Sequence, residues 1–195
     1  GTASENDPSL SSSIPITSSL ASKTGASSFT LSEQETLGSA SIYVQNFVTG
    51  GNLHAFDGEL TYYIFADNPS PLDHPDTTPL LVGTTTAYTT EQLTNLSISN
   101  LDKLTFDFDT PITLDPGSYW FAISATPGTD GTAEEELLWN VYATSPSDFF
   151  YSAPPLVDNT WTTGISFVSQ GGVPAFMLYA AQEVPEPTSL ALGLI

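Results

Sequence analysis

The sequence predicts an all-β fold, a two-sheet antiparallel sandwich of the jelly-roll or Greek-key type with extended N- and C-terminal segments. Short runs of alternating apolar and polar residues recur along the chain, and most glycines and prolines fall between these runs. No apolar period of 3.6 residues is sustained over the length of a helix. Eight or nine short strands at this spacing are typical of two packed sheets.

The clearest single strand is 103–109, in which Leu104, Phe106 and Phe108 alternate with polar side chains. The same reasoning predicts seven further strands, at 39–47, 59–67, 80–89, 118–125, 137–144, 164–170 and 175–181. One short run, 89–96, has Thr89 or Thr90 as a candidate helix cap and could form either a helix or a turn. The inner faces of the sandwich are expected to hold Ile42, Val44, Tyr62, Ile64, Phe106, Phe108, Trp120, Ala122, Trp139, Val141, Phe167 and Met177.

Composition divides the chain into three segments: a Ser/Thr-rich leader at 1–28, the β-sandwich at 29–182 and a short segment at 183–195. A leader of this composition is expected to be disordered on its own. Ile14 and Ile16 nevertheless alternate with other residues as in a short strand. We expect this strand to be donated to the edge of a neighbouring subunit.

The charge balance excludes several classes of partner. The chain has 22 acidic residues, two lysines (Lys23 and Lys103) and no arginine, which gives a net charge of −20. Such a surface repels nucleic acids and anionic lipids. The absence of cysteine also excludes disulfides, thiolate metal sites and a cysteine nucleophile. No apolar stretch reaches the ~20 residues that span a bilayer.

The sequence offers little catalytic chemistry, and we expect the protein not to be an enzyme. His54 and His74 are the two histidines, and no G-x-S-x-G or H-E-x-x-H motif accompanies them. The acidic run at 134–136 could supply paired carboxylates for glycoside hydrolysis, although a run of three acidic residues is more commonly a solvated loop.

Calcium is the metal that the residue types favour, because it binds carboxylate, amide and carbonyl oxygens. Asp67, Asn68, Asp73 and Asp76 offer such oxygens within one loop region. Asp130 and Glu134 form a second cluster. Neither group has the EF-hand spacing, and the alternative for both is an exposed acidic loop.

Exposed aromatic side chains indicate a further hypothesis, a carbohydrate site. Trp161 lies in a turn-like stretch where its ring could stack on a sugar, and the aromatic run 149–151 precedes two prolines. Aromatic residues of a sandwich more commonly belong to its core, which is the alternative.

The last dozen residues carry the most specific motif. Val184, Pro185, Glu186 and Pro187 are followed directly by a short apolar run that includes Leu190 and Leu192. This pattern resembles the PEP-CTERM sorting signal of proteins that Gram-negative bacteria export and an exosortase processes. The apolar run here has eight residues after Pro187 with no arginine cluster, so we expect a truncated form of that signal.

Together these observations predict an exported structural protein of the cell surface or extracellular matrix of a Gram-negative bacterium. We expect it to assemble with copies of itself into a filament or tube, by exchange of the leader around Ile14 and Ile16 and of the tail around Leu190 and Leu192. The alternative is a surface-displayed adhesin or carbohydrate-binding module with an exopolysaccharide as partner. No cofactor other than calcium is expected.

Overall fold

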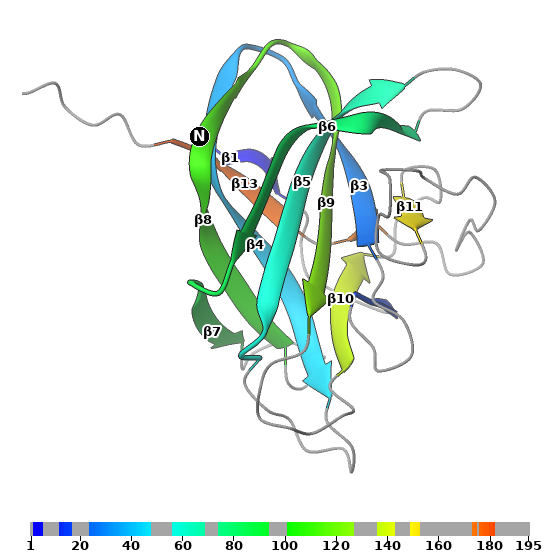
Figure 1. Ribbon diagram of the computed structural model, residues 1–195, viewed down its shortest axis with the longest axis vertical. Helices are drawn as coiled ribbons and strands as arrows, with labels where there is room; N and C mark the ends of the chain where they lie inside the picture. The colour runs from blue at the N-terminus through cyan, green and yellow to red at the C-terminus, as the bar shows by residue number, and fades with distance from the viewer. Residues whose placement is uncertain are drawn as a thin grey trace, which may run out of the picture.

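The protein is a sandwich of two antiparallel β-sheets, which confirms the predicted fold class (Figure 1). The computed structural model describes residues 2–5, 12–16, 24–47, 56–68, 74–93, 101–126, 136–142, 149–152, 173–174 and 176–181. Within these residues the chain forms thirteen strands, eight in one sheet and five in the other. No helix long and apolar enough to cross a membrane occurs in this part of the chain.

The five-stranded sheet has the strand order β11-β3-β9-β5-β6. Its neighbours are mostly far apart in sequence, as a Greek-key connectivity requires. Every pairing in it is antiparallel. The strands are β11 (Phe149–Ser152), β3 (Thr24–Leu31), β9 (Gly117–Thr126), β5 (Glu59–Asn68) and β6 (His74–Thr85).

The eight-stranded sheet is built around β4 (Glu35–Phe47). One edge of β4 pairs with β8 (Leu101–Leu114), which in turn pairs with β7 (Thr89–Leu93). The other edge pairs first with β13 (Phe176–Ala180) and then with β10 (Glu136–Tyr142). Three short strands complete the sheet: β1 (Thr2–Glu5) on β13, and both β2 (Ser12–Pro15) and β12 (Val173–Pro174) on β10.

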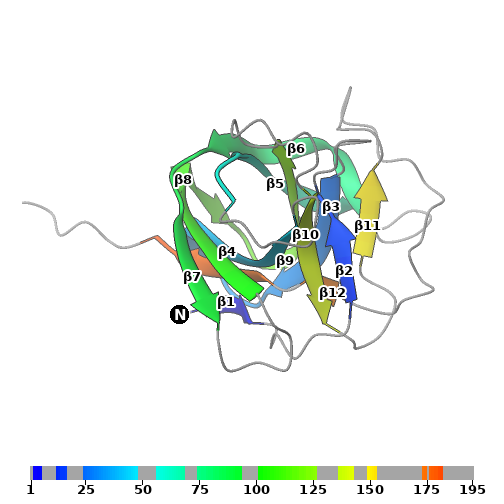
Figure 2. The ribbon, with the colours of Figure 1, turned by 90° about the horizontal axis from the view of Figure 1, so that it is seen from below.

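The core lies between the two sheets, which face each other in the view along the strands (Figure 2). Side chains alternate between the two faces along each strand, so that one set points inward and packs against the opposite sheet. Burying each large apolar side chain contributes roughly 1.5–3 kcal/mol. The structure confirms seven of the predicted core residues: Ile42, Val44, Tyr62, Ile64, Phe106, Phe108 and Trp139.

Three predicted core residues point to the wrong face. Phe121 and Ile123 fill the core from β9, and Trp120 and Ala122 therefore form a second buried cluster on the outer face of that sheet. In β13, Phe176 and Leu178 are buried in the core, and Met177 is half-buried on the other side. Both strands carry apolar residues on both faces, so alternation alone did not fix which face is inside. The remaining two expectations, the Val141 side chain and Phe167, lie outside the described part, as does the predicted strand 164–170.

The helix considered for 89–96 is also wrong. Residues 89–93 form β7, which pairs with β8 from Thr89 opposite Thr105 to Leu93 opposite Leu101. The run begins with two β-branched threonines, which favour a strand. Pairing with a long neighbouring strand therefore outweighs a short capping signal.

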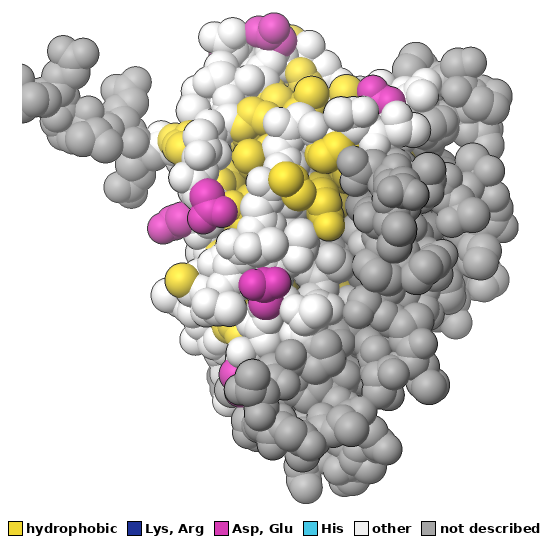
Figure 3. Space-filling model, viewed as in Figure 1, with side chains coloured by type: hydrophobic (Ala, Val, Ile, Leu, Met, Phe, Trp, Pro, Cys, Tyr) yellow, Lys and Arg dark blue, Asp and Glu magenta, His cyan; other side chains and the backbone are white. Residues whose placement is uncertain are grey.

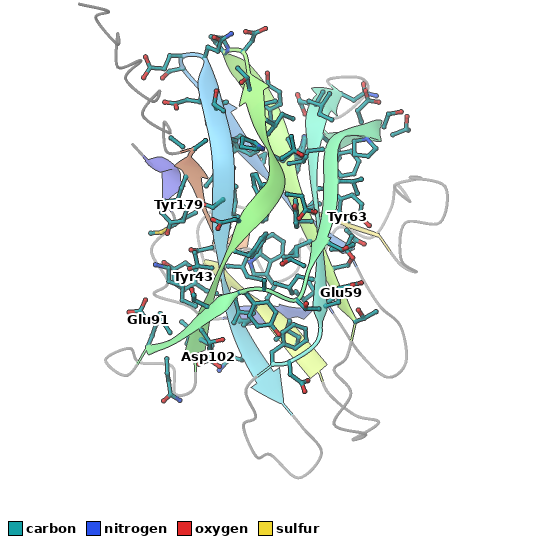
Figure 4. The ribbon with its side chains drawn as sticks, turned by 60° about the vertical axis from the view of Figure 1, so that its left-hand side comes forward. Tyr43, Glu59, Tyr63, Glu91, Asp102 and Tyr179 are labelled. Carbon is teal, nitrogen blue, oxygen red and sulfur yellow. The ribbon has the colours of Figure 1, made fainter. Side chains whose placement is uncertain are left out.

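Hydroxyl and thioether groups connect three strands on the outer face of the eight-stranded sheet. The Tyr43 and Tyr179 hydroxyls both donate to Met177 Sδ, at 3.5 and 3.2 Å. Tyr179 Oη lies 3.1 Å from Ser41 Oγ, which lies 2.7 Å from Thr105 Oγ1. Figure 4 shows Tyr43 and Tyr179 on this side of the sandwich and Tyr63 on the opposite side. The half-buried Met177 thus belongs to a polar network that links β13, β4 and β8.

Tyr62 connects the two sheets across the core. It is fully buried, and its ring stacks on Phe108 at 5.0 Å between ring centroids. Its hydroxyl oxygen accepts a 2.8 Å hydrogen bond from the Asp109 amide, in a bulge where β8 leaves β4. Burial, with a smaller contribution from the Asp109 carboxylate, raises the pKa of Tyr62 above its usual 10.0. The Tyr62 hydroxyl thus joins β5 of one sheet to β8 of the other by a buried hydrogen bond.

Gly83 leaves the space that this tyrosine needs, since it lies directly opposite Tyr62 in the β5–β6 ladder. A Cβ on Gly83 would fall 2.2 Å from Tyr62 Oη and 2.3 Å from its Cζ. We predict that Gly83→Ala lowers the free energy of unfolding by about 1–3 kcal/mol, because the ring must move and release the Asp109 amide. Chemical denaturation tests this against Thr84→Ala, an exposed neighbour on the same strand. Equal stability of the two variants would contradict it.

Candidate functional site

The strongest candidate site is the position that the leader strand occupies, which we call the leader slot. It is the edge of β10 from Leu137 to Val141 together with Ala125 of β9. β2 lies along this edge in antiparallel register, with Ile14 opposite Trp139 and Pro15 opposite Leu138. The leader that we expected to pair with another subunit thus pairs here with its own chain.

Ile16 is the residue that holds the leader in the slot. Its amide donates to the Leu137 carbonyl of β10 at 2.8 Å, and its carbonyl accepts from the Ala125 amide of β9 at 3.2 Å. β10 and β9 belong to different sheets. One residue of the leader therefore links the two sheets through its main chain.

The Ile16 side chain is buried as completely as its backbone is bonded. Its exposed fraction is 0%, and it belongs to the core cluster between the sheets. Leu137 and Trp139, on alternate positions of β10, belong to the same cluster. Trp139 contacts Phe121 and Phe176 edge to face, with centroids 6.2 and 6.3 Å apart. The side chain of Ile16 thus belongs to the same core cluster as the aromatic group of Trp139, Phe121 and Phe176.

Pro15 occupies a position of the β2–β10 ladder at which no backbone N–H is needed. Because Ile16 forms a hydrogen-bonded pair with Leu137, the next such pair along the ladder is Ile14 with Trp139. Pro15 falls at the non-hydrogen-bonded position between them, so its missing N–H removes no bond to β10. The sequence Ile-Pro-Ile therefore suits this strand in this register.

A second part of the leader covers the adjoining edge of the same sheet. β1 pairs with β13, with Thr2 opposite Tyr179 and Glu5 opposite Met177. β13 and β10 lie one after the other along one edge of β4, so β1 and β2 together cover the strands on that side. Unpaired strand edges readily accept other strands, and the leader satisfies these two edges.

The predicted calcium ligands are partly engaged by protein groups. Asp67 Oδ1 accepts a 2.7 Å hydrogen bond from Trp120 Nε1, and Asn68 pairs with His74 across β5 and β6. Asp76 Oδ1 accepts from the Thr77 amide at 2.7 Å. Asp73 lies outside the described residues, as do Asp130 and Glu134. In the described part no group of three His, Asp or Glu side chains is placed to hold a metal ion, and the calcium site stays a prediction.

The other predicted sites cannot be placed on the sandwich. Trp161, the sorting motif from Val184 to Pro187, and the tail residues Leu190 and Leu192 lie outside the described ranges. The glycan, sorting and tail-exchange hypotheses therefore stay predictions.

Asp102 is the described carboxyl whose pKa departs from the ordinary value. It lies two residues from the core residue Leu104, on the same side of β8, and opposite Val44 and Gln92 (Figure 4). Burial raises the pKa of Asp102 above its usual 3.8. The two residues opposite it in register, Val44 and Gln92, carry no charge.

Sequence reasoning found Ile14 and Ile16 but missed the residues that receive them. Leu137 was one of several apolar residues of a predicted strand, and Ala125 carries no distinctive chemistry. The slot uses their backbone groups, which every residue possesses. No family model, no curated protein and no solved structure matches this chain.

We predict that Ile16→Ala lowers the free energy of unfolding by about 2–5 kcal/mol, because it opens a cavity at a fully buried position. Ile16→Val, which removes a single methylene, should cost about 0.5–1.5 kcal/mol. Chemical denaturation of both variants and the wild type gives the comparison. If Ile16→Ala unfolds at the wild-type midpoint, the leader does not occupy the slot in solution.

Proposed function

We propose that this protein is an exported structural protein of the bacterial cell surface or extracellular matrix, and that it polymerises by exchange of the leader between subunits. The observation that carries the proposal is Ile16, a leader residue that is fully buried and bonded to both sheets. A separate short strand that completes a neighbour's fold is an established mode of subunit assembly.

The exchange keeps the same bonds that the leader makes within its own chain. A leader from a second copy would pair with β10 in the same register and place the same isoleucine beneath Leu137 and Ala125. The difference in free energy between the two arrangements is therefore confined to the connection and to the concentration of subunits. The eight residue steps from Ile16 to Thr24, where β3 begins, can span at most about 29 Å when extended.

This arrangement favours open chains of subunits. The leader and the slot are different surfaces, so a contact between them is head-to-tail. A head-to-tail contact generates a filament unless its rotation closes a ring. Each subunit in such a filament donates one leader and receives one.

Export and surface location rest on the C-terminal motif. Val184 to Pro187 and the apolar run after them resemble the PEP-CTERM signal, which implies processing by an exosortase. The net charge of −20 is compatible with a hydrated surface layer and disfavours nucleic-acid partners. The proposed role is structural rather than catalytic because the sequence carries no recognisable catalytic motif, while its leader completes the sandwich.

Cysteine pairing between separate molecules tests the exchange directly, because the chain has no cysteine of its own. Ser13 lies opposite Asn140 at a non-hydrogen-bonded position, where Cα atoms of paired strands are about 4.5 Å apart. Ser13→Cys and Asn140→Cys proteins are unfolded together, refolded at high concentration and oxidised. We expect disulfide-linked dimers that contain one of each variant. A chain with both substitutions should give a ladder of linked polymers on a non-reducing gel.

The matched control uses a pair of strands that the leader does not touch. Thr36 and Thr113 lie opposite each other on β4 and β8, with their hydroxyl oxygens 2.8 Å apart. A mixture of Thr36→Cys and Thr113→Cys should give only the background level of linked dimers. Strand exchange is wrong if the Ser13/Asn140 mixture gives no more than this background and the double variant closes within single chains.

A further inference from the structure

Met177 carries the one sulfur atom of this chain, which has a single methionine and no cysteine. It lies on β13 in the eight-stranded sheet, and its side chain is half-buried on the outer face. Hydrophobic side chains gather on the face of the molecule where β5 and β6 lie (Figure 3), whereas the polar contacts of Met177 are with hydroxyl groups. An oxidant that attacks thiols and thioethers therefore has one target in this protein, on a side chain that is partly accessible to solvent.

Two tyrosine hydroxyls are directed at this sulfur atom. Tyr43 Oη, from β4, lies 3.5 Å from Met177 Sδ, and Tyr179 Oη, from the same strand as the methionine, lies 3.2 Å from it. A thioether sulfur is only a weak hydrogen-bond acceptor. Two phenols at one thioether therefore supply more donor capacity than the unmodified sulfur can use.

The neighbouring hydroxyls reinforce this direction of donation. Because a thioether cannot donate, the one hydroxyl hydrogen of Tyr179 points to Met177, and Tyr179 Oη accepts from Ser41 Oγ, 3.1 Å away. Ser41 has then used its own hydrogen, so its oxygen accepts from Thr105 Oγ1 at 2.7 Å. The series of donors thus runs from β8 through β4 to β13 and ends on sulfur. Hydrogen bonds in series polarise one another, which strengthens the last donor.

We propose that Met177 is an oxidation site, at which a peroxide adds one oxygen atom to Sδ and the hydroxyls of Tyr43 and Tyr179 hold the resulting sulfoxide. In this step sulfur gives two electrons to the peroxide, the O–O bond breaks and the S–O bond forms. With hydrogen peroxide, the second oxygen leaves as water and takes both protons. The sulfoxide is polar where the thioether was apolar, and its oxygen is the stronger acceptor.

The consequence of oxidation here differs from the usual one. Oxidation commonly disrupts a packed methionine, because it places a polar group against apolar neighbours that offer no hydrogen bond. At Met177 two donors already lie at the sulfur atom. The methionine side chain has three rotatable bonds, so a change of rotamer can bring the new oxygen within reach of the phenols. The sandwich should therefore tolerate oxidation of its single thioether.

The site is separate from the leader slot. The slot is formed by β10 and Ala125 of β9, whereas the sulfur and its two donors lie on β13 and β4. Oxidation of Met177 also needs no second copy of the chain. The inference therefore goes beyond the proposed function, and it stands or falls independently of leader exchange.

Peroxide treatment of the folded wild-type protein tests the proposal. Peptide mapping by mass spectrometry measures the share of Met177 that has gained one oxygen, and chemical denaturation gives the unfolding midpoint before and after treatment. We expect Met177 to be oxidised in the folded protein, with the midpoint at or above that of the untreated protein. In Tyr43→Phe/Tyr179→Phe, which lacks both donors, the same oxidation should lower the midpoint.

The matched control is Tyr63→Phe, which removes a phenol hydroxyl from the opposite sheet and should respond to peroxide as the wild type does (Figure 4). Met177→Leu should keep its midpoint in peroxide, because the site is gone. Comparing each variant with its own untreated form removes the cost of the substitution itself. The proposal is overturned if Met177 resists peroxide in the folded protein but reacts in denaturant. It is also overturned if oxidation shifts the midpoints of the wild type and the double variant equally.

Discussion

The two main-chain hydrogen bonds of Ile16 are the interaction on which the rest of this structure depends. β10 belongs to one sheet and β9 to the other, and along this side of the sandwich Ile16 bonds to both. A backbone amide or carbonyl that is buried without a partner costs about 1–3 kcal/mol. Without the leader, the Leu137 carbonyl and the Ala125 amide would lose their hydrogen-bond partners, at this cost wherever they stay shielded from water. The burial of the Ile16 side chain adds an apolar contribution at the same point. The leader strand that ends at Ile16 is therefore part of the fold.

This constraint explains why a low-complexity segment can have a structural role. The leader is rich in serine and threonine and cannot form a core of its own. It contributes a few backbone groups in the correct register and one fully buried side chain, and the sandwich supplies the remainder. In the exchange that we propose, the strand around Ile16 would form the same main-chain contacts in a neighbouring slot that it forms in its own.

Much of the sandwich could be predicted from local alternation. In β8, for example, Leu104, Phe106 and Phe108 face the core, and the polar residues between them face outward. The prediction failed where both faces are apolar, as at Trp120 and Met177, because the period of two then gives no direction. It could identify Ile16 as part of a strand but not its partners. Leu137 and Ala125 are distant in sequence and act through backbone groups, which leave no mark on residue identity. Helical capping at Thr89 likewise gave way to pairing with β8, a contact that no local pattern contains.

Amide hydrogen exchange of the wild-type protein tests the central claim most directly. The Ile16 and Ala125 amides each donate a hydrogen bond in the leader slot, to Leu137 and to Ile16 respectively. If the leader closes the sandwich, both amides should exchange as slowly as those in the middle of β4, through global unfolding rather than local opening. The result holds whether the leader comes from the same chain or from a neighbour. Exchange of these two amides at the rate of an unstructured peptide, while β4 remains protected, would contradict the account.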